Sequence, residues 1–528
     1  MAFDNWASAL CMLIAGWLLV GIGGCGQTKK PAAKKVSKKN VAVAPASPAP
    51  QTKPQPQTPQ PQTPPKSFMP PSTPAGSAAN PPPVAPTIRD SDKPAPPRPA
   101  GSLSDLVERG QAAEFALPQL EEGKIATAGI RKITGKHLTL YTDLPATVED
   151  VARLPQVFDA AVPQWAKYFG VDETKLVDWK LIGCVMESKP RFQGAGLYPG
   201  DLPEFPNGYQ RGSQFWLFDQ PSDYYRRHLL LHEGTHAFMT RWLSGAGPPW
   251  YMEGMAELLG THDWNGERLV LGYNPPDKAL VPYWGRVKIV KEEFAANRGL
   301  TLFDIFRYDA QAHLKNDAYG WCWAVSTFLS NHPATRDEFQ KLQKNTQDRS
   351  IEFSKKFYET LKPQWPQIAE DWQLFVINID YGYDVARAAT VRKASALLPA
   401  GGATVNVAAD RFWQSTGVQV EAGKTYELTA SGRFSLAQQP QPWWSEPNGV
   451  TIEYHQGKPL GMLLAAISEP NAMDTGITPL ASPEIIGLSA KFTPRKNGTL
   501  YLCLNDSPAK LADNQGSATV TINLPAGN

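Results

Sequence analysis

The chain has 528 residues, too many for one ordinary core, and 42% of them are hydrophobic, which is enough for several globular cores. It carries 52 basic and 50 acidic residues, and a net charge of +2 argues against nucleic acid as a partner. The five cysteines form no CxxC pair, which argues against a cysteine zinc site or a thiol redox motif.

The first 25 residues have the pattern of an export signal. An apolar stretch from Trp6 to Ile22 is short for a membrane span and closes on Gly23-Gly24-Cys25. This ending resembles the lipobox of bacterial lipoproteins, and the resemblance implies that Cys25 is lipidated and becomes the mature N-terminus. The alternative is a plain signal anchor in the membrane. Six lysines between 29 and 39, with none before the apolar run, disagree with export by the positive-inside tendency.

Residues 26–100 are rich first in Lys and then in Pro, Gln, Thr and Ala. Segments such as Pro81-Pro82-Pro83 cannot form helices or bury a core. We expect a disordered, semi-rigid linker that carries the following domain away from an anionic membrane surface. The protein is then expected on the periplasmic or cell-surface face of a bacterial membrane.

Folded sequence begins near Ser102, and its first part mixes strands and helices. Apolar periodicity predicts, in chain order, a strand at 137–141, a helix at 148–169 ended by Gly170, a strand at 181–185, a Gly/Pro-rich loop at 189–212, a strand at 214–218 and a helix from 221 through Leu243. Asp223 is a candidate N-cap of that last helix.

The residue pattern of the sequence changes twice after that helix. Residues 285–390 are predicted to be mainly helical. From about 400, period-two segments such as Thr425–Ala430 and Ala518–Asn523 alternate with Gly, Asn and Pro turns, which predicts a C-terminal β-sandwich. The boundary is expected near 398.

The central motif is His232-Glu233-Gly234-Thr235-His236, within an uncharged stretch of the predicted helix. Two histidines four apart lie on one helix face, so both imidazoles can reach one tetrahedral zinc ion. Glu233 can reach a water on the open zinc position and act as the general base. The alternative is a core helix whose histidines bind no metal.

Downstream, Trp250-Tyr-Met-Glu253-Gly-Met-Ala-Glu257 resembles the second motif of gluzincin metallopeptidases, the thermolysin and aminopeptidase superfamily with its peptidase MA-like domains. The resemblance implies that Glu253 completes the zinc site and that Glu257 hydrogen-bonds a zinc-bound histidine, which would fix the ring orientation. The reverse assignment, with Glu257 as the ligand, stays open. His228, one turn before His232, is expected to cap or pack rather than to bind metal.

The same resemblance suggests further site elements between residues 130 and 390. The family often supplies a Tyr or His that stabilises the oxyanion, for which Tyr319 is the candidate and His313 its rival. The strand at 214–218 occupies the place of the substrate-aligning edge strand, to which a peptide can add by main-chain pairing. An interior strand is the equal alternative.

The C-terminal region resembles the galactose-binding domain of calcium-dependent bacterial galactophilic lectins. The resemblance is carried by Phe412–Gly417, Leu428–Gly432, Leu504–Pro508 and Asp513–Gly516. It implies a calcium site of Asp506, Asp513 and Asn514, whose oxygens suit a hard cation. Asn448 could replace the family's sugar-binding Gln, but the family's His is missing, so a glycan-binding and a merely packing sandwich both stay open.

Two of the remaining cysteines, Cys184 and Cys322, lie in apolar surroundings and are expected to be buried free thiols. A disulfide between them is the alternative in an exported protein.

Together these features predict a multidomain chain. Its parts are a signal at 1–25, a linker at 26–100, an α+β gluzincin-like domain with a small sheet and a mostly helical second half at 101–398, and an all-β sandwich at 399–528. The expected function is zinc-dependent hydrolysis of peptide bonds in peptide or protein substrates. The alternative is a catalytically inactive surface protein that binds cell-surface glycans through the sandwich.

Overall fold

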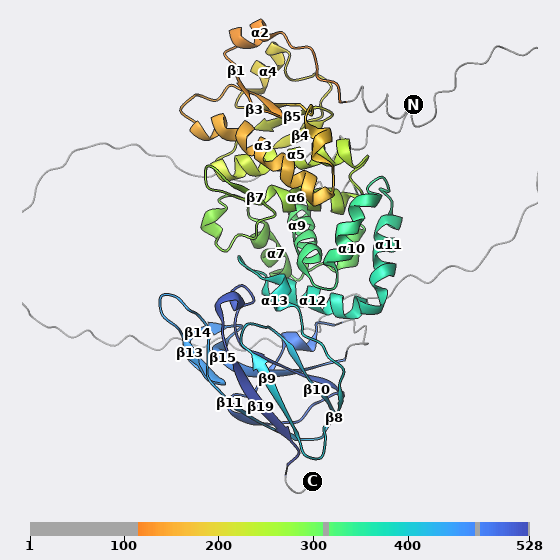
Figure 1. Cartoon of the computed structure of the whole chain (residues 1–528), viewed down its shortest axis with the longest axis vertical. Helices are drawn as coiled ribbons and strands as arrows, with labels where there is room; N and C mark the ends of the chain where they lie inside the picture. Colours follow the sequence, from red (N-terminus) through yellow and green to blue (C-terminus); the bar gives the residue numbers. More distant parts are fainter. Residues whose placement is uncertain (1–114, 310–315, 470–475, 526–528) are drawn as a thin grey trace, which may run out of the picture. The chain divides into compact units, whose positions relative to one another are not determined.

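The computed structural model describes residues 115–309, 316–469 and 476–525 (Figure 1). The predicted signal, its lipobox and the linker therefore lie outside the described residues. Within these ranges, no helix combines the length and the apolar character that a membrane crossing requires.

A five-stranded sheet opens the described fold, with the strand order β1-β2-β3-β5-β4. Its strands are β1 (Arg131–Thr134), β2 (Leu138–Thr142), β3 (Leu181–Met186), β4 (Gly208–Arg211) and β5 (Gln214–Phe218). The strands β2, β3 and β5 are parallel, whereas β1 and β4 run antiparallel to their neighbours. Every residue of β3 is buried, as expected for a strand covered on both faces.

The two faces of this sheet contact different layers. Leu181 and Val185 point into a core shared with helices α3 (Glu149–Phe169) and α5 (Asp223–Trp242). Ile182 and Cys184 point the other way, into a smaller core beneath α2 (Glu122–Thr127) and α4 (Lys189–Ala195). The predicted strands and the helix ended by Gly170, which has the left-handed conformation with φ 64°, are confirmed.

The predicted loop at 189–212 is wrong in two places, because α4 and β4 form within it. Pro190 suits the first turn of α4, and Gly196 ends it with φ 78°. For the strand at 214–218, the interior alternative is confirmed and the edge alternative is wrong: β5 lies between β3 and β4, so β4 is the edge. Ser222, not Asp223, caps α5, since its Oγ accepts a hydrogen bond from the Tyr225 amide.

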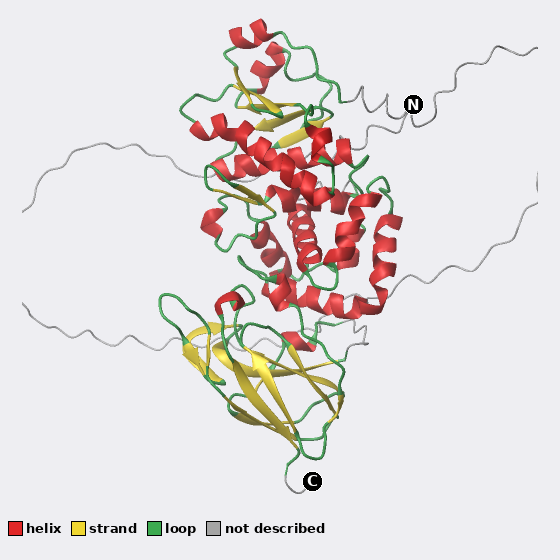
Figure 2. Ribbon diagram, in the orientation of Figure 1, coloured by secondary structure: helices red, strands yellow, loops and turns green. Residues whose placement is uncertain are grey.

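The second half of this region is mainly helical, as predicted (Figure 2). Its elements are α6 (Pro249–Gly260), β6 (His262–Trp264), β7 (Leu269–Leu271), α7 (Arg286–Ala295), α8 (Leu302–Phe306), α9 (Asn316–Asn331), α10 (Arg336–Lys341), α11 (Ile351–Leu361), α12 (Trp365–Asn378) and α13 (Val385–Ala388). Helix α6 packs against both α5 and α9. It therefore lies at the centre of the helical layer.

The C-terminal region is rich in strands, and two of its sheets enclose one core (Figure 2). One sheet has the order β14-β15-β18-β10-β8, with β16 also on β15, and the other has β17-β11-β19-β9. The strands are β8 (Ala396–Leu397), β9 (Ala403–Ala408), β10 (Gln414–Val420), β11 (Tyr426–Ser431), β14 (Asn448–His455), β15 (Lys458–Ser468), β16 (Glu484–Ile485), β17 (Ser489–Phe492), β18 (Gly498–Leu504) and β19 (Ser517–Asn523). Short strands β12 (Phe434–Ser435) and β13 (Trp444–Ser445) pair separately.

Alternate residues of both sheets meet in this core. Leu428 and Val520 come from one sheet, and Leu463 and Leu502 come from the other. This is the arrangement of a β-sandwich, whose inner faces bury every second side chain.

Candidate metal centre

Helices α5 and α6 bring the predicted ligands together. His232 and His236 lie one turn apart on α5, and Glu253 lies on α6, which packs against it. Between the helices, Gly247 with φ 76° turns the chain, and Pro249 occupies the first position of α6. The turn between α5 and α6 therefore reverses the chain direction, and Glu253 faces the two histidines.

The three ligand atoms form a small triangle. The Nε2 atoms of His232 and His236 are 3.1 Å apart, and Glu253 Oε2 lies 3.4 Å from the first and 3.6 Å from the second. Ligands 2.0–2.1 Å from a tetrahedral zinc ion would lie about 3.3–3.4 Å from one another. The triangle thus has the size of one face of a zinc coordination shell.

The surroundings of the Glu253 carboxylate are a second observation that fits a metal ligand. It is fully buried, and neither oxygen has a hydrogen-bond partner among the described residues. A buried carboxylate without partners is costly, whereas a metal ligand in that position is satisfied. The donor set of two imidazoles and one carboxylate therefore fits zinc.

Glu257 lies on the other side of the His232 ring. Its Oε1 is 3.4 Å from His232 Nδ1, and its Oε2 is 3.4 Å from Nε2 of the buried His228. Arg286 donates two hydrogen bonds to the same carboxylate. The geometry thus places Glu253 at the Nε2 atoms and Glu257 at Nδ1, while His228 packs against Glu257.

Burial and neighbouring charges shift the pKa values of Glu253, Glu257 and His228. Burial alone would raise the pKa of Glu253, but His236 and His232 lower it below its ordinary value. Burial would likewise raise the pKa of Glu257, yet Arg286 holds it well below its usual range. Burial lowers the pKa of His228, so this ring is neutral near pH 7. Both acidic groups are therefore ionised, as metal ligation requires.

Glu233 lies against the edge strand of the sheet. It is buried, and a Cβ atom added to Gly208 of β4 would lie only 2.6 Å from Glu233 Oε1. A larger residue at this position would displace the Glu233 carboxylate. Sequence reasoning missed β4, although Gly212-Ser213 between two short runs of strand-forming residues is the pattern of a hairpin turn.

Tyr319 is close to the cluster, as its predicted role requires. It lies in the first turn of α9, and its ring centroid is 6.3 Å from that of His232. The guanidinium carbon of Arg286 is 5.9 Å from the Tyr319 ring centroid. The rival His313 lies outside the described residues. Arg286 itself was missed, because nothing near it in the sequence connects it to the zinc motif.

Helix packing holds the ligand-bearing segments close together. A Cβ on Gly234 would lie 2.6 Å from Trp165 of α3, and one on Gly254 would lie 2.2 Å from Ser326 Oγ of α9. Both glycines are thus needed for the close approach of helices. This accounts for Gly234 inside α5 despite its cost of about 1 kcal/mol relative to Ala.

The predicted calcium residues are only partly brought together. Asp506 and Asn514 are buried, and Asn514 Nδ2 donates to Asp506 Oδ2 at 2.9 Å. Asp513 is exposed, and its Oδ2 accepts from the Gln438 amide at 3.3 Å. Asn448 is used locally as well, since its Oδ1 accepts from the Leu488 amide.

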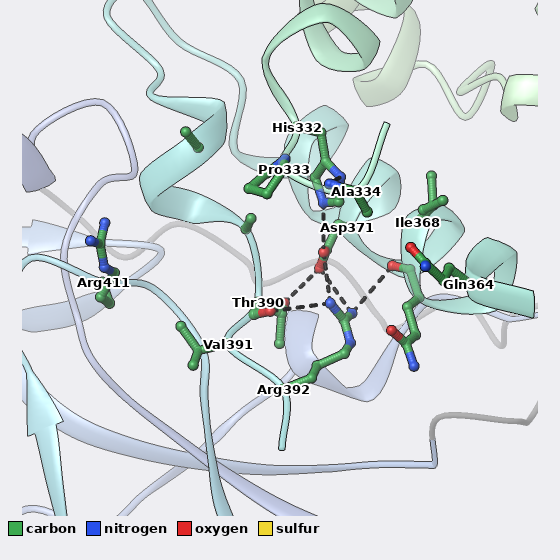
Figure 3. Close-up of a pocket in the computed structure, with 13 residues that line it drawn as sticks. His332, Pro333, Ala334, Gln364, Ile368, Asp371, Thr390, Val391, Arg392 and Arg411 are labelled. Atoms are coloured by element: carbon green, nitrogen blue, oxygen red, sulfur yellow. Dashed lines mark hydrogen bonds and ion pairs between the residues drawn. The ribbon is translucent and has the colours of Figure 1, made fainter. Parts of the chain in front are cut away.

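A separate hollow of about 250 Å³ lies beside α12 and involves none of the metal-centre residues (Figure 3). On its wall, Asp371 accepts hydrogen bonds from His332, Thr390 and Arg392. Arg392 also pairs with Glu370, which accepts from Ser468 and Thr478 of the C-terminal region. This network is satisfied and joins α12 to the sandwich.

Cys184 and Cys322 are buried free thiols, as expected by default. They belong to different hydrophobic clusters, so the alternative disulfide is not formed.

No family model and no curated protein matches the chain. Among solved structures, the chain is similar to one described as "EclA N-terminal domain; PllA-like lectin". The match has 21% sequence identity, covers 23% of this chain and 94% of that one, and has a TM-score of 0.18. A TM-score of this size carries no conclusion about ligand or activity.

Proposed function

We propose that this protein is a zinc-dependent hydrolase of peptide bonds of the gluzincin type. The observation that supports it most is the triangle of His232, His236 and Glu253, in which the carboxylate has no hydrogen-bond partner in the described part of the chain. Glu233, the next residue to His232, supplies the base that such chemistry needs.

Zinc, when bound, would polarise the substrate carbonyl and lower the pKa of a water molecule toward 7. Glu233 would take the proton of that water as its oxygen adds to the carbonyl carbon. As the carbon–nitrogen bond breaks, Glu233 would deliver the proton to the leaving amine. Tyr319 would donate its hydroxyl proton in a hydrogen bond to the oxyanion.

A peptide is the substrate class that the surroundings favour. Strand β4 pairs only with β5 among the described strands, and its Gly208 adjoins Glu233. An extended peptide added along this edge would form main-chain hydrogen bonds within reach of the base. A substrate without a peptide backbone could not use this edge in that way.

The site of action is part of the same proposal. The export signal and the lipobox at Cys25 would anchor the enzyme on the outer face of a bacterial membrane, with the Pro-rich linker as a spacer.

The test is peptide hydrolysis by the zinc-loaded protein, its Glu233→Gln variant and Glu267→Gln, a matched change at an exposed glutamate. A mixture of peptides followed by mass spectrometry avoids assuming a sequence preference. We expect hydrolysis by the wild type and by Glu267→Gln, and a loss of about 10²–10⁴-fold in Glu233→Gln with unchanged zinc content. Equal rates in Glu233→Gln and the wild type would sink the assignment of the base.

Glycan binding by an inactive protein remains the alternative proposal. Trp444, 49% exposed on β13, is an aromatic side chain on which a sugar could stack, with the Arg433 guanidinium carbon 5.0 Å from its ring centroid. The occupied Oδ1 of Asn448 weakens this proposal. Two results together would favour glycan binding. The protein would be retained on a glycan column unless it carries Trp444→Ala, and it would hydrolyse no peptide.

A further inference from the structure

Arg286 is the first residue of α7 and is almost fully buried at 7% exposure. Its Nε donates to Glu257 Oε2 at 2.7 Å and its Nη2 to Glu257 Oε1 at 2.8 Å. Its Nη1 donates to the Trp284 carbonyl oxygen at 2.9 Å. Such a planar, two-pronged contact fixes the plane and direction of the carboxylate.

The carboxylate that Arg286 holds is shared by two imidazoles. Glu257 Oε1 faces His232 Nδ1, and Glu257 Oε2 faces His228 Nε2, each at 3.4 Å. His232 Nε2 belongs to the zinc triangle. A fixed Glu257 therefore sets the rotation of the ring whose opposite nitrogen would bind the metal.

Arg286 also supplies a charge that the centre needs. Glu233, Glu253 and Glu257 are all buried near one another on α5 and α6. Of these three, Glu257 is the carboxylate that lies directly against a buried cation. Arg286 is that cation, and removal of one member of such a buried pair leaves the other as an unpaired charge.

We propose that Arg286 is a positioning residue of the metal centre, acting through Glu257 on His232. The inference rests on the metal part of the proposed function and not on hydrolysis. It assigns to α7 a role in metal affinity that the two sequence motifs on α5 and α6 do not contain.

The test is zinc affinity, measured by competition with a chromophoric chelator at one fixed pH. The variants are Arg286→Gln, Arg286→Lys and Arg298→Gln. Arg298 makes the same two-pronged contact with Glu293, but its side chain is 62% exposed and outside the metal centre. We expect affinity to fall about 10–100-fold in Arg286→Gln and less in Arg286→Lys, which keeps the charge, and to stay unchanged in Arg298→Gln.

A double-mutant cycle separates this role from a merely structural one. If Arg286 acts through Glu257, then Arg286→Gln combined with Glu257→Gln should weaken zinc binding no more than Glu257→Gln alone. Additive losses would overturn the inference. The double variant also removes both charges together, so it is expected to fold even if Arg286→Gln does not.

The visible spectrum of the Co²⁺-loaded protein gives a second readout. A displaced His232 ring should change the d–d bands of Arg286→Gln and leave those of Arg298→Gln as in the wild type. Folded Arg286→Gln with wild-type zinc affinity and Co²⁺ spectrum would refute the role. A wild type that binds zinc but cleaves no peptide would sink hydrolysis alone, and one that binds no zinc would sink both proposals.

Discussion

The candidate metal centre on α5 and α6 and the acidic loop of the C-terminal sandwich both carry residue patterns typical of a metal site, but their geometry differs. At the first, three donors from two rigid helices converge within 3.6 Å, and both oxygens of Glu253 lack a hydrogen-bond partner in the described structure. At the second, Asp506 accepts from Ser507 and Asn514, while Asp513 lies outside on the surface.

The two sites differ because one lies on helices and the other in a loop. Helical spacing fixes the direction of side chains, so His232 and His236, four residues apart, necessarily lie on one face of the helix. A loop fixes only the order of its residues, and here a short helical turn at Leu511–Asp513 directs Asp513 away. A buried carboxylate whose oxygens accept no hydrogen bond is suited to bind a cation, whereas one with hydrogen-bonded oxygens can be structural.

The largest effect is expected for the loss of the candidate carboxylate ligand. Glu253→Gln removes a charged ligand, so zinc affinity should fall by more than the roughly 10–100-fold that changes in outer partners of a metal site cost. Asp506→Asn is the matched change in the sandwich and should leave zinc affinity unaltered. Isothermal titration of both variants checks this, and equal losses in the two would contradict the assignment.

The next effect is a pH dependence of the unfolding free energy that comes from Asp506 in the sandwich. Burial raises the pKa of Asp506 from 3.8 to about 6. Between pH 3.8 and about 6, Asp506 is protonated in the folded protein but not in the unfolded chain. Protonation therefore stabilises the folded protein as the pH falls from 7 toward 4. This contribution is lost as the pH rises through about 6. The contribution is about 3 kcal/mol at most.

Urea unfolding of the wild type and of Asp506→Asn at pH 4 and pH 7 measures this contribution. The difference in unfolding free energy between the two proteins should depend on pH, with the wild type gaining at pH 4. A difference that is independent of pH would show that Asp506 is solvated or bound to a cation in solution.

The smallest effect is expected on stability, from a change at the contact between α6 and α9. In Gly254→Ala the new Cβ would lie 2.2 Å from Ser326 Oγ and 2.9 Å from the Cys322 carbonyl oxygen, so α6 must shift from α9. We expect a loss of about 1–3 kcal/mol in unfolding free energy. Gly194→Ala in α4 is the control, because its Cβ would meet nothing within 4 Å and should stabilise by about 0.5–1 kcal/mol.

Much of the fold followed from periodicity alone. The helix ended by Gly170 and the strand Gln214–Phe218 were predicted close to their observed bounds, because each presents a regular apolar pattern. Helix α4 and strand β4 were missed, because Gly and Pro dominate residues 189–212 and the short elements there depend on tertiary contacts. The interior place of β5 could not be predicted without β4.

The convergence of the three candidate ligands was predictable for the same reason, and their surroundings were not. The spacing of His232, His236 and Glu253 follows from helices and one turn, whereas Arg286 reaches Glu257 across 29 positions of chain. The cap of α5 shows the same limit on a smaller scale. Ser222 and Asp223 are both good caps by type, and only the backbone conformation, extended at Ser222, selects one of them.

The most direct test of the central claim is the zinc K-edge X-ray absorption spectrum of the purified protein. The account predicts one zinc ion bound by two imidazole nitrogens and carboxylate oxygen at about 2.0–2.2 Å, with no sulfur ligand. A folded protein that takes up no zinc, or a spectrum dominated by sulfur at about 2.3 Å, would contradict it.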